Sequence, residues 1–96
     1  MSPKNKIKLN LLRKKLDKLD YLLLKTIKKR TEIVKKVLTL KSYKKEIIDK
    51  KRISVILKKI KKESLKRNID PKITKRIWKN MIWSYIDFEK RNFKKK

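Results

Sequence analysis

The chain has 96 residues, of which 34 are Lys or Arg and 9 are Asp or Glu, so its formal net charge is +25. The absence of Cys and His excludes disulfides, thiol chemistry and histidine-based acid–base or metal chemistry. With no Gly and two Pro, tight turns are hard to build, which favours an all-α fold. This length suits one small domain over residues 1–96, and we expect loose tails at 1–6 and 91–96.

The excess of positive charge suggests a polyanionic partner, such as nucleic acid or an acidic membrane. Most of the charge is Lys and is spread over the whole chain, which is typical of a solvated surface and of an AT-rich coding sequence. No segment is long and apolar enough to cross a bilayer, and no signal peptide is evident. We therefore expect a cytoplasmic protein without metal or cofactor, and without specific nucleic-acid or membrane binding.

The stretch from about Ile7 to Lys41 contains no Gly or Pro, and its apolar residues return every three or four positions. This heptad spacing predicts a helix that buries one stripe against another helix. The residues of this stripe are Leu12, Leu16, Leu19, Leu23, Thr26, Arg30, Ile33, Val37 and Leu40. Arg30 stands where an aliphatic residue is expected, and a buried cation is costly unless it is paired. A helix of roughly 50 Å is too long for a compact domain of this size, which favours pairing with a second copy.

Two shorter helices are predicted in the rest of the chain. Residues 42–48 break the pattern and read as a loop, after which Asp49 is a suitable N-cap. This second helix should end near residues 66–68. Asp70-Pro71 is a strong start signal for a third helix, which should run to about Phe88 or beyond.

Charged residues interrupt the apolar faces of all three predicted helices. Besides Arg30 on the stripe of the first predicted helix, they are Arg13, Lys41, Asp49, Arg52 and Glu89. Taken singly, each of these residues can be explained as an ordinary surface charge. Glu89 closes the stripe that contains Trp78, Ile82 and Tyr85.

The spacing of two arginines along the first helix favours a symmetric dimer. Arg13 and Arg30 are about 25 Å apart along one helix, too far to share a small ligand within one chain. In an antiparallel pair centred near Leu23 or Leu24, the partner's Arg13 falls between Arg30 and Lys41. The dimer would then hold two equivalent cationic pockets, suited to a small, multiply anionic ligand.

These residues resemble a known family. The pattern Leu12-Arg13-x-x-Leu16-Asp17-x-Leu19-Asp20, followed by Ile27-x-x-Arg30-x-Glu32-x-Val34 and Lys41, is similar to the first helix of AroQ-class chorismate mutases. Asp49-x-x-Arg52 resembles the start of the second helix, and Ile77-Trp78-x-x-Met81-Ile82-x-x-Tyr85-x-x-x-Glu89 resembles the third. The resemblance covers about residues 9–90. It implies an intertwined, all-helical homodimer in which the long first helices pair.

The resemblance also implies an activity, the rearrangement of chorismate to prephenate in aromatic amino-acid biosynthesis. No nucleophile or metal is needed for this reaction, because the enzyme holds the substrate dianion in a compact conformer and stabilises charge on the breaking ether oxygen. By this analogy the partner's Arg13 and Arg30 bind carboxylates, and Lys41 contacts the ether oxygen and a carboxylate. Arg52 and the backbone of Asp49 lie near the ring end of the substrate.

Three positions depart from the family pattern. Ile53 stands where many members have a Glu that holds the ring hydroxyl. Tyr85 replaces a residue that is frequently small and polar, so it either packs or reaches the substrate with its hydroxyl. Glu89, facing the ether oxygen, replaces a frequent Gln and must be protonated to donate a hydrogen bond there. We therefore expect turnover to be higher at mildly acid pH than at pH 8.

Other functions remain open at the level of the sequence. An isochorismate pyruvate-lyase of the same fold would use a similar cationic pocket. A basic helical nucleic-acid-binding protein would need its charge concentrated on one face, next to base-reading side chains. A purely structural coiled coil would be stabilised by Arg30→Leu without any loss of function.

Overall fold

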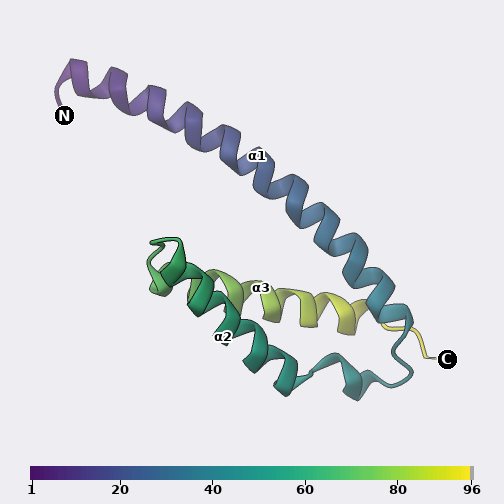
Figure 1. Ribbon diagram of the computed structural model, residues 1–96. Coiled ribbons are helices and arrows are strands. Elements are labelled where there is room, and N and C mark those ends of the chain that lie inside the picture. Colours follow the sequence, from purple (N-terminus) through teal and green to yellow (C-terminus); the bar gives the residue numbers. More distant parts are fainter. Residues whose placement is uncertain (96) are drawn as a thin grey trace. The chain divides into compact units, whose positions relative to one another are not determined.

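The computed structural model describes residues 1–95, which are almost entirely helical (Figure 1). The elements are α1 (Pro3–Thr39), the 3-10 helix η1 (Lys44–Ile47), α2 (Lys50–Lys66) and α3 (Pro71–Asn92). This confirms the predicted all-α class with one long and two shorter helices. The chain divides into two compact units, Met1–Ile33 and a second that begins at Val34.

The first unit is the N-terminal part of α1, and this helix begins earlier than expected. The prediction that residues 1–6 form a loose tail is wrong, because α1 starts at Pro3. Ser2 caps it: its Oγ accepts from the Asn5 N–H at 3.2 Å, and its carbonyl accepts from the Lys6 N–H. Proline fits the first turn of a helix, where its missing N–H has no intrahelical partner. Ser2-Pro3 is therefore a start signal of the same kind as Asp70-Pro71.

The heptad stripe predicted from Leu12 to Leu40 follows α1 and is called the α1 seam from here on. Its N-terminal half is apolar and accessible to solvent. Its first four leucines, from Leu12 to Leu23, are each 55–59% exposed. Leucines at this spacing gain free energy when a second helix covers them, by about 1.5–3 kcal/mol for each fully buried side chain. The isolated helix does not provide that burial.

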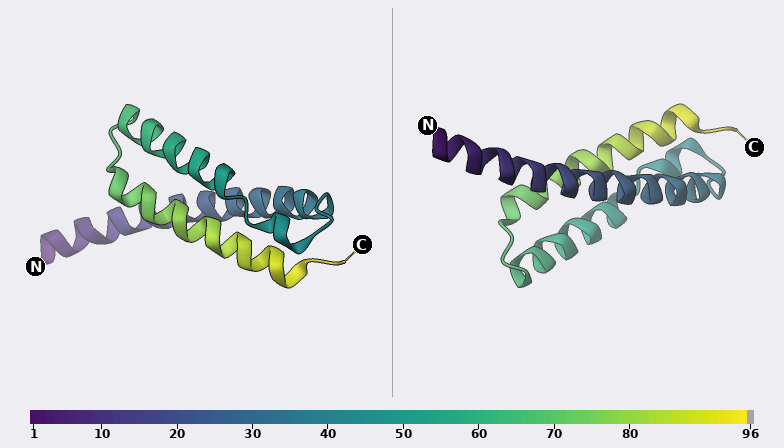
Figure 2. Two further views of the ribbon diagram at one scale, coloured as in Figure 1. Left: turned by 90° about the horizontal axis from the view of Figure 1, so that it is seen from below. Right: turned by 90° about the horizontal axis from the view of Figure 1, so that it is seen from above.

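The second unit contains a helical hairpin, in which α2 and α3 lie side by side and run in opposite directions (Figures 1 and 2). Both predicted N-caps are confirmed. Asp49 Oδ1 accepts from the Arg52 N–H, and Asp70 Oδ1 accepts from the Lys72 N–H, each at 2.9 Å. Each cap satisfies an N–H group that the first helical turn leaves without a backbone partner.

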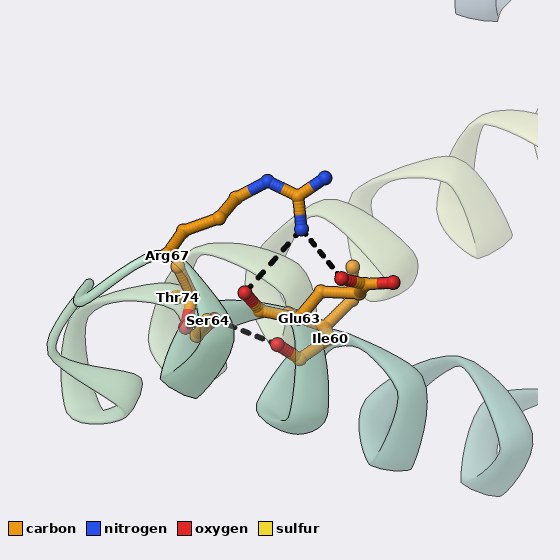
Figure 3. Close-up of polar contacts among 5 residues, drawn as sticks. All are labelled: Ile60, Glu63, Ser64, Arg67 and Thr74. Atoms are coloured by element: carbon orange, nitrogen blue, oxygen red, sulfur yellow. Dashed lines mark hydrogen bonds and ion pairs between the residues drawn. The ribbon is translucent and has the colours of Figure 1, made fainter.

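The turn of the hairpin is fixed by one left-handed residue and one buried pair of hydroxyls. Asn68 has φ 55°, a conformation that Asn tolerates better than most residues in a chain without Gly. Ser64 Oγ donates to the Ile60 carbonyl at 2.6 Å and lies 2.7 Å from Thr74 Oγ1 (Figure 3). Because Ser64 has a single hydroxyl hydrogen, Thr74 is left as the donor between them. This polar contact joins α2 to α3.

Arg67 and Glu63 form an ion pair on the outer side of the same turn (Figure 3). The hydrogen bond and the positive charge of the Arg67 guanidinium lower the pKa of the Glu63 carboxyl. A carboxyl whose pKa is lower in the folded than in the unfolded state stabilises the fold above its unfolded pKa. That contribution is lost as the pH falls through the folded value.

The core of the second unit is small and draws on three elements. Leu38 of α1, Ile47 of η1 and Ile86 of α3 are buried together. The surrounding residues that pack against them are Ile48, Ile53, Ile82 and Phe93.

The core explains two errors in the predicted boundaries. Residues 42–48 contain η1 instead of an irregular loop, because Ile47 is 3% exposed and anchors the segment. The Glu46 carboxylate stabilises the turn by accepting from the Tyr43 N–H at 3.0 Å. At the other end α3 extends to Asn92, and Phe93 packs against the core. Residues 91–93 are therefore not a loose tail, and residue 96 lies outside the described residues.

Candidate active site

Lys41 and Glu89 form an ion pair across 48 positions of sequence. Lys41 follows the end of α1, and its backbone N–H donates to the Leu38 carbonyl at 3.1 Å. Glu89 projects from the buried face of α3, one turn beyond Ile86. Lys41 Nζ lies 3.2 Å from Glu89 Oε1 and 3.3 Å from Oε2. The structure thus brings together the two residues that the family resemblance assigned to the ether oxygen.

Burial makes this pair more than a surface contact. The side chain of Glu89 is 8% exposed and that of Lys41 is 18% exposed. A carboxylate removed from water in this way is costly unless a cation and hydrogen bonds compensate it. The Lys41 ammonium has three N–H donors, and two of them serve Glu89. The third is available to an oxygen of a bound ligand.

An open hollow of about 710 Å³ adjoins Lys41 at the start of α2. It is lined by Lys41, Glu46, Ile48, Asp49, Lys50 and Lys51. The side chain of Asp49 is engaged as the N-cap, so what it offers a ligand from that position is mainly its backbone. Arg52, one turn into α2, has an exposed side chain. The hollow is large enough for a small organic dianion.

Arg13 and Arg30 belong to the first unit. Both lie on α1 and both are exposed. They are about 25 Å apart along this helix, so one small ligand does not reach both within the same chain.

Two of the unusual positions have packing roles. Ile53 packs against the core formed by Leu38, Ile47 and Ile86, so the position that the resemblance assigned to a ring-binding Glu carries an apolar contact here. Tyr85 is half-buried on α3, one turn before Glu89.

Sequence reasoning missed three charged residues that line the hollow: Glu46, Lys50 and Lys51. Glu46 was part of the segment that was read as a loop. Lys50 and Lys51 were read as members of a general Lys surface. The sequence nevertheless contained a signal for Lys50 and Lys51. They lie in the first turn of a helix, where cations oppose the helix dipole and are unfavourable.

Comparison with known proteins agrees with this arrangement. Residues 12–90 match the family model described as chorismate mutase type II. No curated protein and no solved structure matches the chain. The matched region runs from the α1 seam to one residue beyond Glu89, and includes every residue of the candidate site. The chain is therefore a member of the type II chorismate mutase family, whose activity is that of an isomerase.

Proposed function

We propose that this protein converts chorismate to prephenate in the synthesis of Phe and Tyr, and that Lys41 and Glu89 act on the breaking ether bond. The observation that carries the proposal is the buried Lys41–Glu89 pair beside a hollow of suitable size, because the family resemblance assigns both residues to the ether oxygen. The matched family supplies the reaction class.

The proposed mechanism requires binding and electrostatics only. Negative charge develops on the ether oxygen as its bond to carbon breaks, and an ammonium held in a poorly hydrated site stabilises that charge more than water does. Lys41 is held in place by Glu89 before substrate arrives, so little reorganisation is needed during the reaction. Glu89 in its acid form would donate a second hydrogen bond to the same oxygen.

The proposed active unit is an antiparallel homodimer. The exposed leucines of the α1 seam support it, since they form the surface that a second copy of α1 would cover. Two-fold pairing places the partner's Arg13 in the pocket of Arg30 and Lys41, where the two guanidinium groups bind the substrate carboxylates. One chain alone would lack one of these cations.

The test supplies the purified protein with chorismate and follows the loss of chorismate absorbance in the ultraviolet, with prephenate identified as the product. A Lys41→Gln variant with unchanged helical content is the matched control and should lose most of the activity. A parallel assay with isochorismate detects pyruvate. Release of pyruvate without prephenate formation would assign the chain to the lyase reaction instead, and a folded dimer inert to both substrates would refute the proposal.

A further inference from the structure

The first turn of α2 carries charge of the wrong sign for helix stability. It begins Lys50-Lys51-Arg52, and no acidic residue lies in that turn. The N-terminal end of a helix bears partial positive charge, so acidic side chains are favoured there and cations are not. Among residues 1–95, no carboxylate lies within ion-pairing distance of Lys50 or Lys51. These two lysines therefore oppose the dipole of α2 and do not stabilise its first turn.

Lys50 and Lys51 both line the hollow beside Lys41. Its other charged lining residues are Lys41 itself, Glu46 and Asp49. Each acidic side chain already accepts a hydrogen bond from a backbone N–H, and Lys41 is paired with Glu89. Lys50 and Lys51 thus differ from Lys41: among the described residues, no carboxylate lies within hydrogen-bonding distance of either.

We propose that Lys50 and Lys51 capture the substrate dianion at the mouth of the Lys41–Glu89 site. This inference rests on the proposed function, because it takes chorismate as the anion. Local rules of helix stability are commonly broken at functional positions, where the cost is offset by binding. The two ammonium groups attract the carboxylates before and during docking, so they act on kcat/KM and not on the rearrangement itself.

The experiment compares two double variants of α2 that remove the same charge. K50Q/K51Q alters the hollow, whereas K62Q/K66Q alters two exposed lysines that line no hollow described here. At an ionic strength of about 10 mM we expect K50Q/K51Q to lower kcat/KM roughly three- to tenfold through KM, with kcat within about twofold of the parent. The difference should shrink at about 0.5 M salt. K50R/K51R should keep the parent value.

Stability supplies a second readout that a purely structural role would not produce. K50Q/K51Q removes cations from the positive end of α2, so its melting temperature should rise while kcat/KM falls. In K62Q/K66Q we expect neither a rise in melting temperature nor a fall in kcat/KM. Equal losses of kcat/KM in the two double variants, or no loss in K50Q/K51Q, would overturn the inference.

Binding of prephenate, the dianionic product, separates this inference from the proposed function. If the parent protein does not consume chorismate, the proposed function fails, and calorimetry with prephenate still tests the hollow. Weaker prephenate binding in K50Q/K51Q than in K62Q/K66Q supports the capture site. Equal binding in the two variants refutes it.

Discussion

At the residue scale, the proposed mechanism gives Lys41 two tasks that conflict when substrate binds. In the free protein it compensates the buried carboxylate of Glu89, which accepts from Nζ through both oxygens. A substrate carboxylate or ether oxygen competes for the same ammonium. The Lys41–Glu89 pair is therefore formed before the ligand binds. The ligand must then replace Glu89 as the acceptor of some hydrogen bonds from Lys41.

Removing Lys41 should expose the folding role of the pair. We expect Lys41→Met to destabilise the protein by about 2 kcal/mol, because it leaves a buried carboxylate without its cation. The double variant K41M/E89M should recover most of that loss while remaining inactive. Urea denaturation at a fixed protein concentration measures both changes. A single variant as stable as the parent would show that the pair contributes nothing to folding.

Glu89→Gln tests which group the ether oxygen requires beside Lys41. In the proposed mechanism a carboxylate cannot donate a hydrogen bond to that oxygen, whereas the amide of Gln can. We therefore expect Glu89→Gln to remain active, and Glu89→Leu, which has no donor, to lose most of its activity. The measurement is kcat of both variants and of the parent at one pH. A Glu89→Gln variant as inactive as Glu89→Leu would rule out the donor role at this position.

At the element scale, α2 and α3 are joined at their turn by the hydroxyls of Ser64 and Thr74 (Figure 3). Ser64 is 3% and Thr74 9% exposed, so either hydroxyl is costly when it lacks a close partner. The two substitutions are not equivalent. Ser64 keeps its bond to Ile60 without Thr74, whereas Thr74 without Ser64 retains only a 3.4 Å contact to the Pro71 carbonyl.

Ser64→Ala should therefore cost about 1–2 kcal/mol of folding free energy, and more than Thr74→Val. The double variant S64A/T74V should be more stable than S64A alone, because it leaves no hydroxyl buried without a partner. Chemical denaturation of the three variants checks this order. Additive losses in the double variant would indicate that the hydroxyls contribute independently.

At the scale of the whole molecule, the proposed pockets are shared between two copies of the chain. Arg13→Ala and Arg30→Ala should each abolish activity as pure proteins. In a mixed dimer, however, one pocket combines the intact Arg30 of one chain with the intact Arg13 of the other. Random exchange makes about half of the dimers mixed, each with one working site of two, so mixing should restore about a quarter of the parent activity.

The assay mixes the two inactive variants under conditions that allow exchange of chains, and then measures chorismate turnover. A mixture of Arg30→Ala with Lys41→Gln is the control, because both changes fall in the same pocket and each mixed dimer has no intact site. Restored activity in the control, or none in the test mixture, would contradict the shared pocket.

Much of the fold followed from local signals in the sequence. The heptad spacing gave the long helix, and Asp49 and Asp70 located the starts of α2 and α3, because an N-cap is a contact between near neighbours. The η1 segment was missed, since it is ordered by the burial of Ile47 in a core that no local pattern reveals. Ile53 likewise looked like a lost substrate contact, and its role became clear only from its packing.

The candidate site was less predictable from the sequence than the fold. Lys41 and Glu89 were identified as partners of one ligand atom, but their direct pairing depends on the turn between α1 and α2 and could not be read from spacing. Lys50 and Lys51 were hidden by composition, because in a chain with 34 basic residues a functional lysine looks like the others. Their place beside the hollow, together with their position in the first turn of α2, distinguishes them.

Ile47 has a consequence for how this protein would respond to heat. It is buried in the connection between α1 and α2 and Ile48 packs beside it, so two side chains and a few hydrogen bonds hold the segment that follows Lys41. Such a segment opens at lower free energy than the helices around it, and its amides exchange hydrogen sooner. Each opening releases Lys41 from its fixed position. Catalysis would therefore fade on warming while the helices are still intact, and would return on cooling.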